Sequence, residues 1–235
     1  MTFEEELEAA RIRKAEYIKQ HGEEAWKTHI AELKRRSNEE HERQEIESLS
    51  MLRIERSGLA DCIERMTFST FTTREQWQQS MKNKCLKFIQ QTENKWLFIG
   101  GPPGCGKTHL GTAVCTRHIK AGRPTRYTTF AQLMIELRSN ANDDDEYERI
   151  LNEYGRCEVL YIDDFMKFEP SESDKKHAFE LLNMRYVRGG ITIITSERHL
   201  SDVMKLDEAL GSRIKQMCGE YAINIAKADG RNFRI

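Results

Sequence analysis

A loop able to hold phosphate groups is the strongest chemical signal in this sequence. Its residues fit the pattern G-x-x-x-x-G-K-[ST] at every fixed position. They are Gly101, Pro102, Pro103, Gly104, Cys105, Gly106, Lys107 and Thr108. An apolar run precedes the loop at Trp96–Ile99, and a helical pattern follows it over 107–121. Because this strand–loop–helix order is the context that the pattern requires, we predict a binding site for ATP or ADP.

The residue types in the loop suit this chemistry. Gly104 and Gly106 let backbone N–H groups turn inward around phosphates, at the positive end of the following helix. Lys107 is expected to neutralise the β- and γ-phosphates and so to act in catalysis. The hydroxyl of Thr108 is expected to ligate Mg²⁺.

Two carboxylates follow the loop by about fifty residues. The run Glu158–Ile162 is an apolar strand pattern, and it ends in Asp163 and Asp164. Asp163 is predicted to hold Mg²⁺, and Asp164 to orient and deprotonate an attacking water. Asp is one methylene shorter than Glu, which predicts slow hydrolysis. The alternative is that paired aspartates merely end a strand.

A third apolar strand pattern, Ile191–Thr195, also has a polar end. Thr195 and Ser196 are candidates for sensing the γ-phosphate and positioning water. Ordinary strand-end hydroxyls are the alternative. Further on, Arg213 lies on a predicted helix and is a candidate arginine finger, reaching the nucleotide of a neighbouring subunit. A solvated arginine is the alternative there. Arg231 and Arg234 are weaker candidates for touching the nucleotide within the same chain.

The elements that must position these residues alternate between strands and helices. Five strand candidates occur, at Trp96–Ile99, Arg126–Phe130, Glu158–Ile162, Ile191–Thr195 and Tyr221–Ile225. The clearest helical pattern is Asp174–Arg188, with a glycine just past its end. This alternation predicts an α/β fold with a five-stranded parallel sheet and helices on both faces. The polar run Asn140–Glu146 is expected to be an exposed acidic loop.

Composition excludes several classes of protein. The chain of 235 residues has a formal net charge of −1, so any nucleic-acid contact must come from a local patch. Its six cysteines show no C-x-x-C spacing, which argues against zinc and against a disulfide framework. No apolar run approaches the length of a membrane span. We therefore expect a cytoplasmic protein with no membrane partner.

The first 50 residues differ from the rest, with more charge and no proline. They are predicted to form two helices broken at Gly22, the second beginning near Glu23 with Trp26, Ile30 and Leu33 on one narrow apolar face. A narrow apolar face within dense charge favours a module that docks on a partner protein. A solvated helical hairpin lying against the main domain is the alternative.

Five segments in one order resemble the AAA+ ATPases of the replicative helicase loader family (DnaC/DnaI type, including phage-encoded members). They are Gly101–Leu110, which includes His109; Leu160–Asp164; Asn183–Tyr186; Ile191–Ser196; and Gly211–Ile214. The transposition helper ATPases of the IstB type are close relatives. The resemblance covers about residues 52–235. It implies an additional-strand P-loop fold, in which the sensor strand lies between the loop strand and the acidic strand.

The resemblance also implies roles and partners. Residues 51–235 would form an AAA+ domain without a full helical lid, and residues 1–50 would grip a hexameric replicative helicase. His109, directly after the phosphate loop, is expected to help bind the nucleotide, and residues 66–71 match the stretch that borders the adenine. The helix Ala131–Ser139 matches a segment that contacts single-stranded DNA, with positive charge from Arg123, Arg126 and Arg138 and with Tyr127 available to stack. For these arginines a solvated face is the alternative. Glu197 departs from the family, because many relatives have Asn at this position.

The implied function is an ATPase that forms homo-oligomers when bound to ATP and loads a ring helicase onto single-stranded DNA. An IstB-like helper that delivers a transposase is the runner-up. A P-loop kinase for a small metabolite is a third possibility, although Phe165–Ser173 is short and poor in arginine for a phosphate lid. A protein that captures the helicase without turnover is the fourth.

Overall fold

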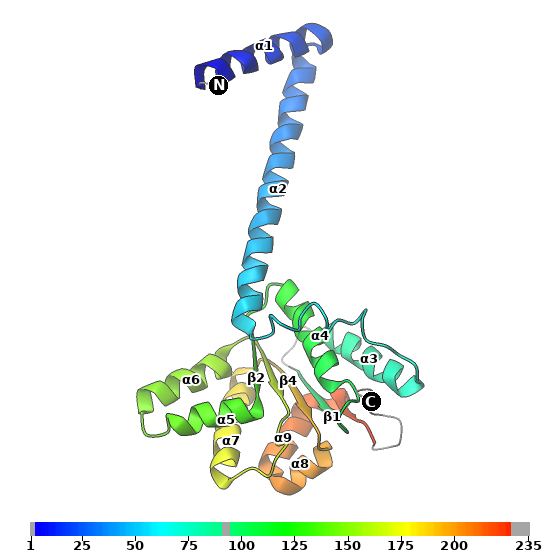
Figure 1. Cartoon of the computed structure of the whole chain (residues 1–235), viewed down its shortest axis with the longest axis vertical. Helices are drawn as coiled ribbons and strands as arrows, with labels where there is room; N and C mark the ends of the chain where they lie inside the picture. The colour runs from blue at the N-terminus through cyan, green and yellow to red at the C-terminus, as the bar shows by residue number, and fades with distance from the viewer. Residues whose placement is uncertain (1–2, 91–94, 227–235) are drawn as a thin grey trace. The chain divides into compact units, whose positions relative to one another are not determined.

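The computed structural model describes residues 3–90 and 95–226. They divide into two compact units, residues 1–49 and 50–235. The elements in chain order are α1 (Phe3–His21), α2 (Glu23–Ser57), α3 (Gln76–Ile89), β1 (Trp96–Gly100), α4 (Lys107–Lys120), β2 (Thr125–Thr129), α5 (Phe130–Ser139), α6 (Asp144–Arg156), β3 (Val159–Asp163), α7 (Glu172–Arg188), β4 (Ile191–Ser196), α8 (Leu200–Leu206), α9 (Glu208–Cys218) and β5 (Ala222–Asn224) (Figure 1).

The first unit consists of helices that meet at Gly22, whose φ of 90° is the left-handed conformation that ends α1. Tyr17 of α1 stacks on His29 of α2, with ring centroids 4.9 Å apart, and lies 5.5 Å from the ring of Trp26. The predicted break at Gly22 and the start of α2 at Glu23 are confirmed. Helix α2 continues to Ser57, past the end of the predicted N-terminal region.

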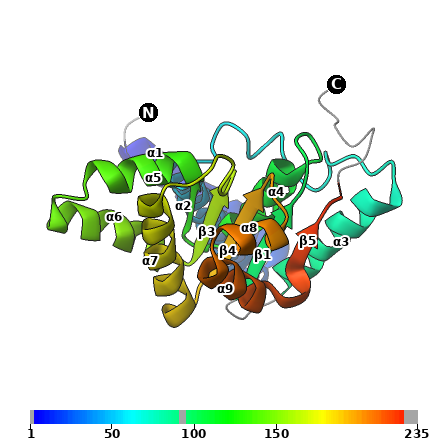
Figure 2. The same ribbon diagram turned by 90° about the horizontal axis from the view of Figure 1, so that it is seen from below.

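The second unit is built on a five-stranded parallel sheet in the order β2-β3-β4-β1-β5. Figure 2 shows β3, β4, β1 and β5 side by side. Every residue of β1, β3 and β4 is buried, because helices cover both faces of a parallel sheet. The predicted α/β fold of AAA+ type is confirmed, and β4 is the additional strand between β1 and β3.

Helices α3 and α4 cover one face of the sheet, and α5 to α9 cover the other. This arrangement brings the carboxyl ends of β1, β3 and β4 to one edge of the sheet, where the ends of parallel strands form a crevice. The phosphate loop, the two aspartates and the hydroxyls of β4 therefore meet there.

The boundaries of the predicted strands shift by one residue or more. Phe130 was predicted to end a strand but begins α5, because the Thr129 hydroxyl accepts from the N–H of Gln132 and caps that helix. Glu158 precedes β3, and Tyr221 lies in a 3₁₀ turn before β5. Each correction is at an element end, where capping and turn geometry decide the assignment.

The predicted acidic loop over 140–146 is wrong in its second half. Asp143 caps α6 by accepting a hydrogen bond from the N–H of Glu146, and the helix begins at Asp144. Acidic side chains in the first turn are stabilised by the positive end of a helix. The loop itself is shorter than predicted.

Along the described residues, no helix has the length and apolar character needed to cross a membrane.

Candidate nucleotide site

The phosphate loop joins β1 to α4. Gly104 has a φ of 75° and Gly106 a φ of 91°, both in the left-handed region that side chains disfavour. Gly106 is also the N-cap of α4 and offers no side chain to the first-turn N–H groups. Those N–H groups are consequently available to an anion, as a phosphate cradle requires.

Phe71 closes one side of the loop. A Cβ atom at Gly106 would lie 2.6 Å from the ring of Phe71, so the glycine is needed for packing as well as for its backbone angle. His109 of α4 donates a hydrogen bond from Nε2 to the carbonyl of Thr67 at 2.8 Å, and its ring meets the edge of Phe71 at 5.2 Å. His109 therefore fastens the segment 67–71 beside the loop, a packing role that the sequence did not reveal.

Lys107 is buried, and its ammonium donates to the carbonyl of Pro102 across the loop at 2.9 Å. The side chain thus spans the concave side of the loop. Cys105 is buried, with its Sγ 3.9 Å from Lys107 Nζ.

Asp163 is the centre of the acidic side of the site. It is buried at the end of β3 and accepts from the hydroxyl of Thr108 at 3.3 Å and from the N–H of Asp164 at 3.0 Å. The hydroxyl of Thr195, at the end of β4, also donates to the same carboxylate oxygen. Three separate elements converge on this oxygen, so the sheet topology assembles the cluster.

The oxygens of Thr108 and Asp163 fit Mg²⁺, a hard cation that takes oxygen ligands and usually keeps several waters. The uncapped start of α4 and the positive-φ glycines fit the phosphates of a nucleotide. The residues present thus match the predicted ligands.

The two hydroxyls of the predicted sensor have different surroundings. Thr195 contacts Asp163, whereas Ser196 donates to the carbonyl of Phe165 at 2.7 Å and accepts from the N–H of Arg198 at 3.0 Å. Thr195 can orient the carboxylate, and Ser196 fixes the segment that follows β3. Contact of either hydroxyl with a γ-phosphate stays a prediction.

Removing the Thr195 hydroxyl should weaken the acidic side of the site without disturbing its shape. We expect Thr195→Val to lower the rate of ATP hydrolysis by about tenfold, since a hydrogen bond to a charged group contributes roughly 1.5–3 kcal/mol. Hydrolysis and its magnesium dependence would be measured side by side with Thr116→Val, which removes a hydroxyl bonded only within α4. Equal effects of the two substitutions would contradict a specific role for Thr195.

Arg213 lies on α9, and its ring contacts are with α7. Its guanidinium stacks over the rings of Phe179, at 4.7 Å, and Tyr186, at 5.1 Å, both on α7. Its Nη1 atom is buried without a hydrogen-bond partner among the described residues. Its role as a finger toward a neighbouring subunit stays a prediction. Arg231 and Arg234 lie outside the described residues.

The three arginines predicted to face DNA each have an ion-pair partner. Arg123 pairs with Glu158 at 3.3 Å, Arg126 with Glu153 at 2.5 Å, and Arg138 with Asp174 at 3.3 Å. Sequence reasoning missed these carboxylates because they come from α6, α7 and the segment before β3. DNA contact at these positions would have to compete with the pairs.

Sequence reasoning also missed Lys167. Its ammonium lies 3.0 Å from Asp164 and 3.1 Å from Glu197. Asp164 and Glu197 raise the pKa of Lys167 through these hydrogen bonds. The sequence did contain one signal for this contact, since Lys167 stands three residues after Asp164.

Comparison with known proteins agrees with this site. The sequence model of the family described as "IstB-like ATP binding protein" matches residues 7–216. The uncharacterized protein YqaM of Bacillus subtilis is 31% identical over 183 residues, which is 72% of this chain and 58% of YqaM. The chain spans about half the length of the curated relatives it matches.

Solved structures share the fold. A structure of the DnaC helicase loader has a TM-score of 0.59 and 22% identity, covering 66% of this chain and 95% of that one. The replication initiator DnaA bound to AMPPCP and single-stranded DNA has a TM-score of 0.61 and 19% identity, covering 72% of this chain and 51% of that one. The predicted resemblance to the loader and IstB-type ATPases is confirmed, and the chain belongs to the family of IstB-like ATP binding proteins.

Proposed function

We propose that this protein is a magnesium-dependent ATPase that loads a ring-shaped replicative helicase onto single-stranded DNA. The observation that carries the proposal is the joining of an ATP-binding fold, shared with a helicase loader, to a separate helical unit with an aromatic cluster. The product of such a reaction is a change of assembly, so binding and release matter more than rapid turnover.

The proposed chemistry follows from the positions of the side chains. Lys107 binds the β- and γ-phosphates, and Thr108 and Asp163 hold Mg²⁺, which would supply charge neutralisation at the phosphates. Thr195 keeps the Asp163 carboxylate oriented through its hydrogen bond. Asp164 is the group proposed to take a proton from the attacking water. Arg213 is proposed to complete the site of a neighbouring subunit.

The helical unit is the part of the chain that is proposed to bind the helicase. Tyr17, Trp26 and His29 form a half-buried aromatic cluster where α1 meets α2, and Leu33 extends the apolar face with its side chain exposed. Charged side chains border this face, among them the ion pair of Arg36 with Glu32. A small apolar face bordered by charge suits pairing with a partner helix.

Affinity capture from the native cell extract with ATP present tests the partner. We expect a hexameric helicase in the eluate of the wild-type chain and about a tenfold or greater loss with Trp26→Ala, because buried aromatic anchors dominate interfaces. Val187→Ala, an exposed apolar position on α7, is the matched control and should retain the helicase. Equal capture of the helicase by all three chains would refute the proposal that the aromatic cluster binds it.

Single-stranded DNA is the proposed second partner, supported by the shared fold with DnaA bound to such DNA. Because Arg123, Arg126 and Arg138 already have carboxylate partners, binding there should be strongly salt-dependent.

The runner-up is an IstB-like helper that delivers a transposase, and the family to which the chain belongs favours it as much. The same capture experiment distinguishes the two, since a transposase in the eluate would replace the loader proposal. The relatives described above give no support to a small-molecule kinase. A passive helicase binder would show capture without ATP hydrolysis.

A further inference from the structure

Lys167 lies between two carboxylates from the ends of neighbouring strands. Its ammonium is 3.0 Å from Oδ2 of Asp164, just after β3, and 3.1 Å from Oε1 of Glu197, just after β4. The three side chains are only partly exposed, at 34%, 37% and 27%. One ammonium therefore has two competing acceptors, one of which is the proposed catalytic carboxylate.

The segment that carries Lys167 is fixed by the end of β4. Phe165 donates its N–H to the carbonyl of Thr195 at 2.8 Å, and Ser196 donates to the carbonyl of Phe165. Arg198 donates from Nε to the carbonyl of Met166 at 2.7 Å. These bonds hold the backbone between Asp164 and Lys167, so the fold brings the two side chains together.

The backbone of this segment is also strained. Asp164 has a φ of 53° and Met166 a φ of 49°, a left-handed conformation that is uncommon for a methionine. Such conformations persist where surrounding contacts enforce them and are concentrated at functional sites. The Asp164 carboxylate contacts Lys167 within this strained segment.

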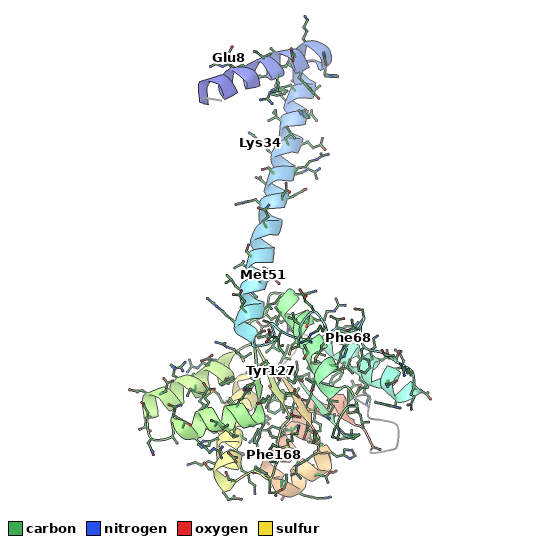
Figure 3. The ribbon with its side chains drawn as sticks, in the orientation of Figure 1. Glu8, Lys34, Met51, Phe68, Tyr127 and Phe168 are labelled. Atoms are coloured by element: carbon green, nitrogen blue, oxygen red, sulfur yellow. The ribbon has the colours of Figure 1, made fainter. Side chains whose placement is uncertain are left out.

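Lys167 also has space beside it. Together with Asp164 and Phe168 it lines a cavity of about 350 Å³ bordered by α5 and the start of α7. Phe168, labelled in Figure 3, is 74% exposed. The flexible lysine stem can therefore swing away from Asp164 without displacing packed core atoms.

An ion-paired carboxylate oxygen is poorly placed to accept a proton from water. We propose that Lys167 restrains Asp164 in the resting site, and that Glu197 takes over the Lys167 ammonium when Asp164 acts on water. Lys167 is thus a positioning residue, and Glu197 is its second acceptor. The inference rests on the proposed ATPase function and adds a restraint to it.

Four variants separate the roles of Lys167 and Glu197. Lys167→Met should raise kcat for ATP hydrolysis about two- to fivefold, the change that corresponds to loss of a partly exposed ion pair. Glu197→Gln should lower kcat by a similar factor, because the ammonium then stays on Asp164. The double variant should behave like Lys167→Met, since Glu197 acts only through the lysine. Lys167→Arg should stay close to wild type, and KM should change little throughout.

Lysine acylation followed by mass spectrometry gives a readout that needs no nucleotide. Lys167 should be labelled more in Asp164→Asn than in the wild-type chain, because its amine then has one carboxylate partner, Glu197, instead of two. Lys205, paired with Asp202 at 3.1 Å on α8, is the control and should not change. Thermal unfolding of each variant establishes that it is folded.

Particular outcomes would overturn the inference. Turnover by the wild-type chain with unchanged or reduced kcat in Lys167→Met would show that the lysine does not restrain Asp164. A different kcat for the double variant and for Lys167→Met would show that Glu197 does not act through Lys167. A wild-type chain that binds ATP but never hydrolyses it would overturn the proposed ATPase function itself, and the inference with it.

Discussion

Lys107→Ala should lose most of the affinity of the chain for ATP and ADP. The buried ammonium spans the phosphate loop, and charge-assisted bonds of this kind contribute roughly 1.5–3 kcal/mol, or about 10- to 150-fold in affinity. Titration with a fluorescent ATP analogue measures the loss. Delivery of the captured helicase to single-stranded DNA should fall with it.

Lys120→Ala is the matched control, because Lys120 is an exposed lysine in the last turn of the same helix. It should bind nucleotide as the wild-type chain does. Lys107→Ala also removes a bond within the loop, so its thermal unfolding is compared with that of the control. Full nucleotide affinity in Lys107→Ala would remove the basis of the proposed site. Normal helicase delivery despite lost affinity would refute the ATP-driven mechanism alone.

Arg185→Met should destabilise the second unit, which contains the parallel sheet, by about 3 kcal/mol, a drop in Tm of roughly 10 °C for a domain of this size. Arg185 is fully buried and donates to the Thr192 hydroxyl and to backbone carbonyls of Tyr154, Gly155, Cys157 and Ile191. Burial lowers the pKa of Arg185 below its usual value, yet an arginine stays charged at neutral pH.

Methionine fills similar space but leaves those carbonyls buried without a donor, and this loss exceeds the gain from removing a buried charge. Arg185→Lys keeps the charge but presents its donors at one point, so it should recover only part of the stability. Differential scanning calorimetry of the three chains measures the series. A Tm within about 2 °C of wild type for Arg185→Met would mean that the carbonyls find other donors.

Much of the fold could be predicted from the sequence because its signals are local. The phosphate loop needs glycines at fixed spacing, and strands buried on both faces are continuous apolar runs. The end of the apolar run at Asp163 placed the acidic residues at the correct edge of the sheet. Errors occurred where capping decides the boundary, as at Phe130 and Asp144.

Side-chain partners could not be predicted in the same way. Arg185 lies in the segment Asn183–Tyr186 that resembles the loader family, but its acceptors come from α6, the segment after it and β4. The apparent positive groups Arg123 and Arg138 meet carboxylates from other elements. The residue pattern of one segment cannot predict which charged side chain another segment places beside it.

By itself, the sequence determined that a phosphate loop and an acidic strand end exist in one parallel sheet, because both depend on residue types at short spacing. Only the tertiary structure decided that β4 places Thr195 on Asp163 and Glu197 on Lys167. Those contacts join residues thirty or more positions apart in the chain. The sheet order that brings them together results from packing both faces against helices.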